Sequence, residues 1–168
     1  MISTWKKLAV AAALVAAAPL ASAAVVPIGS WGSFGFGTAP SFIDTYTIDV
    51  APGTHVKVRI VDGFVIGDEF SYSVDGGALQ FTSDADANDG VQSNAFDGDA
   101  AWADPRLSRA LLYLLPGLHT IDLSIIENAA GFSGGGQAFI RADVPEPATL
   151  GMLGLALAGL GFSRRKAA

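Results

Sequence analysis

Hydrophobic and polar residues alternate with a period of two along much of the middle of the chain. In FIDTYTIDV (residues 42–50) apolar residues alternate with polar ones from Tyr46 to Val50, and in THVKVRIVD (54–62) they do so from Val56 to Ile60. This alternation predicts strands with one buried and one solvated face. The short Ala51-Pro52-Gly53 link between the two runs predicts that they form a hairpin.

The same pattern continues towards the C-terminus. The run from Phe70 to Val74 ends at Asp75-Gly76-Gly77, a tight-turn sequence, and Leu79 and Phe81 begin a return strand. Leu112 to Leu115 runs into Pro116-Gly117, and Ile121, Leu123 and Ile125 then alternate inward. Glycines loop out over 131–136, and 137–142 forms a last strand. The Gly-aromatic stretch 29–37 is an edge strand or a loose arm.

These elements predict a single all-β domain over residues 24–143. Asp104-Pro105-Arg106 could begin a helix, but a helix over 106–115 would be apolar almost all round, so a turn leading into a strand is favoured. Seven or eight short strands with Gly and Pro turns indicate an antiparallel β-sandwich, jelly-roll-like in plan. An N-terminal signal helix and a short C-terminal apolar helix are expected to flank it.

The N-terminal segment has the layout of a secretory signal peptide. Lys6 and Lys7 precede an apolar run over 8–18, and Ala21-Ser22-Ala23 places small residues at the two positions that a signal peptidase reads, Ala21 and Ala23. Residues 1–23 are therefore predicted to direct export and to be removed after Ala23. The apolar run is too short for a membrane anchor.

The C-terminal segment has a different order. Pro145-Glu146-Pro147 is followed by an apolar run over 148–162 and then by the basic residues Arg164, Arg165 and Lys166. Fifteen helical residues reach about 22 Å, which is short of the roughly 30 Å hydrocarbon core unless the arginines snorkel. The run predicts a marginal transmembrane helix, and the basic cluster predicts a membrane stop that stays cytoplasmic.

Val144-Pro145-Glu146-Pro147, the apolar helix and the basic end together resemble the PEP-CTERM sorting signal of bacterial exported proteins. The resemblance covers about the last 25 residues, 144–168, and implies processing by an exosortase, a membrane enzyme related in chemistry to cysteine transpeptidases. It also implies transient anchoring in a Gram-negative-type envelope, then a cell-surface or extracellular location. Members are often associated with exopolysaccharide or biofilm matrix. The alternative is an ordinary short C-terminal anchor.

The charge of the predicted domain restricts its partners. Residues 24–143 hold five basic and fifteen acidic residues, a net charge of −10. No basic stripe is available for phosphates, so nucleic acid is excluded as a partner. The chain has no cysteine, so the exported domain must be held together by its core alone or with help from a bound metal.

One segment is dense in carboxylates, and calcium is the ion that its chemistry suits. DADANDGVQSNAFDGDAAWAD (84–104) contains no basic residue, and calcium prefers six to eight oxygen ligands. The spacing is not that of an EF-hand, so a solvated acidic loop remains the alternative. The expected ligands are Asp84, Asp86, Asn88, Asp89, Asp97 and Asp99.

Two further patterns bear on function, and we expect a protein without catalytic residues or an organic cofactor. Residues 131–135 match G-x-S-x-G, but Ser133 lies in a glycine loop with no following helix, and His55 and His119 lie at outward or edge positions. A secreted hydrolase is therefore disfavoured. The second pattern is a set of aromatic residues that could form a sugar-stacking platform: Trp31, Phe34, Phe36 and Trp102. The alternative is that these rings pack in the core or at its rim.

Overall fold

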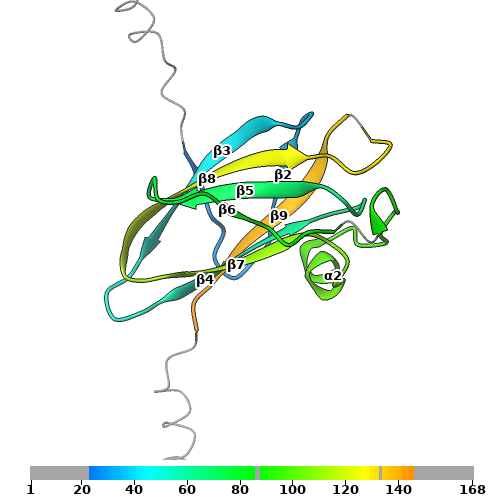
Figure 1. Ribbon diagram of the computed structural model, residues 1–168. Helices are drawn as coiled ribbons and strands as arrows, with labels where there is room; N and C mark the ends of the chain where they lie inside the picture. The colour runs from blue at the N-terminus through cyan, green and yellow to red at the C-terminus, as the bar shows by residue number, and fades with distance from the viewer. Residues whose placement is uncertain (1–22, 86–87, 133, 146–168) are drawn as a thin grey trace, which may run out of the picture.

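The computed structural model describes residues 23–85, 88–132 and 134–145. The predicted signal helix and the segment from Glu146 onward lie outside these residues. The described chain forms two facing sheets and one short helix (Figure 1). The elements are β1 (Ala24–Val25), β2 (Gly32–Phe36), β3 (Ser41–Val50), β4 (Val56–Asp62), β5 (Glu69–Val74), β6 (Gln80–Phe81), α2 (Gly98–Ala103), β7 (Arg109–Leu114), β8 (Gly117–Glu127) and β9 (Gly136–Asp143).

The two sheets confirm the predicted all-β sandwich. The five-stranded sheet has the order β1-β3-β8-β5-β6, and the four-stranded sheet has the order β2-β9-β4-β7. All the pairings between these strands are antiparallel except the short one between β1 and β3. The stretch 29–37 contains β2, which is an edge strand. Of the two predicted alternatives, an edge strand or a loose arm, the first is therefore correct.

The predicted hairpin between β3 and β4 is wrong. β3 pairs with β8 in one sheet, whereas β4 pairs with β7 and β9 in the other, so the link crosses between the sheets. Thr54 N–H donates to Ala51 O over 3.2 Å, and Gly53 has φ +77°, the pattern of a type II turn with Pro52 at its second position. Type II turns splay the flanking strands. The Pro116-Gly117 link likewise joins strands of opposite sheets.

The other predicted turn does form a hairpin. Asp75 and Gly76 both have positive φ, +52° and +66°, and Gly77 N–H donates to Val74 O over 2.8 Å. This is a type I′ turn, whose twist matches that of paired strands. β5 and β6 accordingly pair through Ser71–Phe81 and Tyr72–Gln80.

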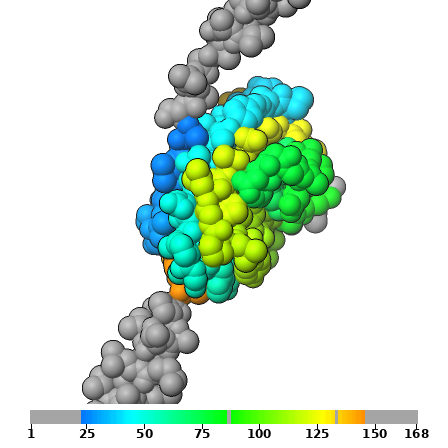
Figure 2. Space-filling view, turned by 90° about the vertical axis from the view of Figure 1, so that its left-hand side faces the viewer, coloured from blue at the N-terminus to red at the C-terminus, as the bar shows by residue number. Residues whose placement is uncertain are grey.

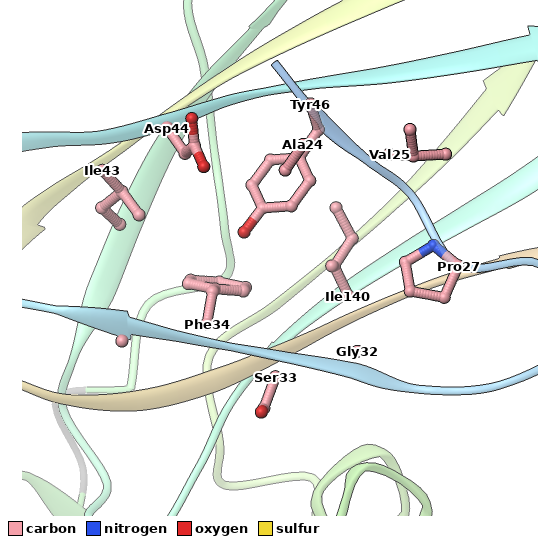
Figure 3. Close-up of a pocket in the computed structure, with 11 residues that line it drawn as sticks. Ala24, Val25, Pro27, Gly32, Ser33, Phe34, Ile43, Asp44, Tyr46 and Ile140 are labelled. Carbon is pink, nitrogen blue, oxygen red and sulfur yellow. The ribbon is translucent and has the colours of Figure 1, made fainter. Parts of the chain in front are cut away.

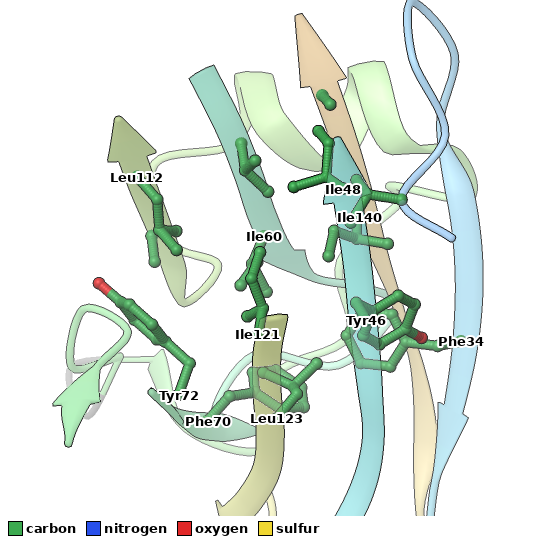
Figure 4. Close-up of a cluster of buried hydrophobic side chains, with 14 of the residues drawn as sticks. Phe34, Tyr46, Ile48, Ile60, Phe70, Tyr72, Leu112, Ile121, Leu123 and Ile140 are labelled. Atoms are coloured by element: carbon green, nitrogen blue, oxygen red, sulfur yellow. The ribbon is translucent and has the colours of Figure 1, made fainter. Parts of the chain in front are cut away.

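The core lies between the inner faces of the two sheets (Figure 4). Phe70 of β5 packs edge-on against Phe34 and Phe36 of β2, with ring centroids 5.8 and 5.1 Å apart. A second, smaller cluster lies on the outer face of the four-stranded sheet, where α2 covers Val61 and Phe139. The helix is therefore an attachment to the sandwich and not part of its centre.

We predict that Phe70→Ala lowers the free energy of unfolding by about 3–5 kcal/mol, because it leaves a cavity where a fully buried ring joined the sheets. Phe42→Ala is the matched control, since Phe42 is 60% exposed on β3. It should change stability by less than about 1 kcal/mol. Urea unfolding followed by tryptophan fluorescence measures both, and equal losses would contradict this account of the core.

Candidate functional site

The sorting segment begins directly after the last strand. β9 ends at Asp143, which accepts from Arg141 Nε over 2.7 Å and lies 3.2 Å from Arg59 Nη1. Val144 is exposed, and it and Pro145 are the described members of the predicted motif. Glu146, Pro147 and the basic residues Arg164, Arg165 and Lys166 lie outside the described residues.

The described chain enters and leaves the domain at different places. In the space-filling view the first residues (blue) lie along one side of the molecule and the last residues (orange) lie at its lower end (Figure 2). Ala24, the residue after the predicted cleavage site, begins β1 and pairs with Tyr46; Ala21 lies outside the described residues.

A recess of about 400 Å³ lies between β1, β2 and β3 (Figure 3). Its walls include Val25, Phe34, Ile43 and Ile140, and the Tyr46 ring lies among them. Burial, with a contribution from Asp44, raises the pKa of Tyr46 to about 12, so the phenol keeps its proton at physiological pH. The Asp44 carboxylate lines the recess as well, so its walls carry one acidic group beside the phenol.

The described members of the predicted calcium segment bind separate partners. Asp97 caps α2 by accepting from Ala100 N–H over 2.8 Å. Asp99 accepts from Trp31 Nε1 over 2.8 Å, and Asp89 accepts from Ala130 N–H over 2.6 Å. Across the described residues, no three acidic or histidine side chains gather into a metal site. Of the two remaining described members, Asp84 is exposed and Asn88 is half-buried. Asp86 lies outside the described residues, so calcium binding by this segment stays a prediction.

Two buried carboxylates that the sequence analysis did not select lie at the ends of residues 62–68. Asp62 ends β4 and Asp68 precedes β5, and both are buried. Asp62 Oδ1 accepts from Gly63 N–H over 2.7 Å, whereas Asp68 Oδ1 accepts from Ala129 N–H over 3.0 Å. Burial, and then the charge of Asp68, raises the pKa of Asp62 to about 9, and burial raises that of Asp68.

The chain between these carboxylates is strained. Phe64 has φ +68°, and Val65 N–H donates to Gly63 O over 2.8 Å, so residues 63–65 form a γ-turn with a positive central φ, which is rare for a residue with a side chain. The Phe64 ring is held by Phe96 and Phe139, with centroids 5.6 and 6.3 Å away. Strain of this kind persists only where the surroundings impose it.

The histidines occupy different settings. His55 is exposed, at the start of the chain leading into β4. His119 Nδ1 lies 2.7 Å from Asp75 Oδ2 and its Nε2 lies 2.8 Å from Leu115 O. Both ring nitrogens of His119 are therefore engaged, and the bond to Asp75, then that to Leu115, raises the pKa of His119. Ser133 lies outside the described residues.

Of the four aromatics considered for a sugar-stacking platform, Phe34 and Phe36 are buried in the core, which is the packing alternative. Trp31 and Trp102 lie together on the outer face of the four-stranded sheet, with centroids 6.2 Å apart and planes tilted by 38°. A Cβ on Gly98 would meet the Trp31 ring at 2.2 Å, and Arg141 lies 5.8 Å from the same ring. Trp31 is thus engaged in holding α2 on the sheet.

The His119–Asp75 pair predicts a pH-dependent stability. The pKa of His119 is raised above 6.5 in the folded state, so its contribution is full below pH 6.5 and is lost as the pH rises through the folded-state pKa. Asp75→Asn should flatten this fall in the free energy of unfolding above pH 6.5. Urea unfolding between pH 5.5 and 8.5 measures it; His55→Gln should keep the wild-type slope, and an unchanged slope in Asp75→Asn would refute the assignment.

Comparisons with known proteins address the C-terminal segment and the fold. The family model of the PEP-CTERM protein-sorting motif matches residues 143–166. No curated protein sequence matches the chain significantly. One similar solved structure is the pre-peptidase C-terminal domain of collagenase from Bacillus anthracis, with a TM-score of 0.44 and 12% identity over 72% of this chain and 94% of that one.

The match at 143–166 confirms the predicted sorting motif. Within the described residues no helix is long and apolar enough to cross a membrane, and the apolar run 148–162 falls outside them. The motif itself indicates export and transient membrane anchoring before the protein reaches the surface or the exterior. The chain accordingly carries a PEP-CTERM sorting motif, which indicates an exported protein that is sorted by an exosortase-type membrane enzyme.

Proposed function

We propose that the sandwich is a non-enzymatic module of the cell surface or extracellular matrix, delivered there by exosortase sorting and bound to matrix polysaccharide. The observation that carries the proposal is the position of the sorting motif, whose match begins at Asp143, the last residue of β9. The whole sandwich is therefore the cargo of the sorting system. Signal peptidase is the partner proposed for the N-terminal end.

The contacts of the polar side chains favour a structural role over catalysis. His119 is engaged through both ring nitrogens, and Asp97 is engaged as a helix cap. Asp104 binds Arg106 through both carboxylate oxygens, at 2.9 and 2.7 Å, and accepts from Ser93 Oγ. Groups held in this way are poorly placed to transfer protons to a substrate.

The distribution of positive charge favours an acidic polysaccharide. Although the domain has a net charge of −10, four of its five basic residues lie on the outer face of the four-stranded sheet, where Asp143 pairs with Arg59 and Arg141. On the same face Tyr113 is 63% exposed, and Lys57 Nζ lies 5.8 Å from its ring centroid. An exposed ring beside cations suits a sugar that carries carboxylates. The four residues are Lys57, Arg59, Arg109 and Arg141.

Changing the sorting motif tests the delivery. Replacing Pro145-Glu146-Pro147 with three alanines should leave the chain held at the membrane but block maturation, so that an unprocessed form accumulates. Deleting residues 148–168 should instead release an unprocessed domain with an unchanged melting curve, because the sandwich ends at Asp143. Cell fractionation with mass spectrometry of the C-terminus reads both, and normal trimming of the alanine variant would reduce the segment to a simple anchor.

Changing the outer face tests polysaccharide binding. The double substitution Lys57→Ala, Tyr113→Ala should raise the Kd for a uronic-acid polymer about tenfold, the equivalent of about 1.4 kcal/mol, through loss of a cation and a stacking ring. Phe81→Ala removes a ring of similar exposure from the other sheet and should leave the Kd unchanged. Co-sedimentation with the uronate polymer and with a neutral glucan measures it, and equal binding by both variants would reject this face.

A further inference from the structure

One carboxylate oxygen at the end of β4 has no partner. The Asp62 side chain is 0% exposed, and its Oδ2 receives no hydrogen bond from the described residues. Oδ1 accepts from Gly63 N–H, but burial of a carboxylate with one oxygen unsatisfied and no basic partner is unfavourable, so such a group either holds a proton or binds a cation.

The surroundings of Asp62 are negatively charged. Asp62 is paired with Ala138 of β9, and Asp68 Oδ2 lies against Gly136 of the same strand, so the two buried carboxylates lie beside the same end of β9. Asp89 Oδ1 also lies against Gly67, a residue that stands between Asp62 and Asp68 in the sequence. None of the ion pairs found among the described residues gives Asp62, Asp68 or Asp89 a basic partner. A single proton would leave most of this charge uncompensated.

The oxygen atoms nearby come from several loops at one end of the sandwich. A Cβ on Gly63 would lie 2.8 Å from Gln137 O, and one on Gly136 would lie 3.4 Å from Asp68 Oδ2. Asn128 joins the same region, since its Nδ2 donates to Gly37 O over 3.2 Å and lies 3.4 Å from Asp68 Oδ1. Carboxylate and carbonyl oxygens are the ligands of a hard cation, and an irregular set of them suits calcium better than magnesium.

We propose that Asp62 and Asp68 bind a calcium ion that ties the end of β4 to the start of β5. Only these two carboxylates would coordinate the ion, since no three acidic side chains converge within the described residues. Backbone carbonyl and water oxygens would complete the coordination shell. β4 and β5 belong to opposite sheets, so the ion cross-links the sandwich. In a chain without cysteine this link takes the place that a disulfide has in many exported domains. Exported proteins meet calcium at the concentrations that such sites require.

The full chain in detergent, melted in EDTA and in calcium, tests the proposal. Calcium at tenfold excess over its Kd should raise the wild-type Tm by about 4–6 °C. Asp62→Asn should abolish this shift and, because it removes the cost of burying or protonating this carboxylate, should raise the Tm measured in EDTA. Asp68→Asn should abolish the shift as well. Asp97→Asn and Asp99→Asn, in the acidic segment, are the matched controls and should keep it.

Isothermal titration with calcium chloride gives the second readout, with one ion expected per wild-type chain and none for Asp62→Asn. This result does not depend on a melting transition, so it also decides the matter if one variant is too unstable to melt cooperatively. Absence of any calcium response up to 5 mM would overturn the proposal and leave Asp62 as a buried protonated acid. A response lost in Asp99→Asn but kept in Asp62→Asn would also overturn it and assign the ion to the acidic segment.

Discussion

The two sheets are joined by a small group of aromatic rings, and the remaining features of the molecule depend on that contact. Phe70 enters from one sheet and meets Phe34 and Phe36 from the edge strand of the other. The chain has no cysteine, so burial of such side chains supplies most of the free energy that holds the sandwich closed. The loops that carry the polar sites are positioned only as well as this core positions the strands from which they extend.

The alternation of apolar residues predicted the strands and their inward side chains, but not the sheet to which each strand belongs. Ile48 and Ile60 were both expected to point inward, and both are buried. They reach the core from opposite sides, since β3 and β4 lie in different sheets. A period of two shows that one face of a strand is buried, but it does not show which neighbouring strand or sheet buries that face. Turn geometry decides that question. Asp75-Gly76 adopts two positive φ angles and closes a hairpin, whereas Pro52-Gly53 splays its strands and sends the chain across.

The same limit explains why the buried acids were overlooked. A search for density of aspartate finds segments such as 84–104, where several carboxylates are held by backbone amides or by surface partners. Asp62 differs, because it occupies the next alternate position after Val58 and Ile60 on β4, whose side chains point into the core. A carboxylate in an inward position contradicts the pattern around it, and such contradictions are expected where function or a bound group compensates. Asp68 gave no comparable signal, because its burial depends on loops distant in sequence.

The position of β9 explains how the sandwich tolerates being tethered and processed at its C-terminus. β9 is an inner strand, paired with β2 along one side and with β4 along the other. A pull on the sorting segment therefore loads two ladders of hydrogen bonds along their length, whereas an edge strand would be held by only one. Asp143, the last residue of the strand, is held in addition by Arg59 and Arg141. Because these contacts end where the motif begins, cleavage beyond Val144 removes no ladder bond and leaves the core unchanged.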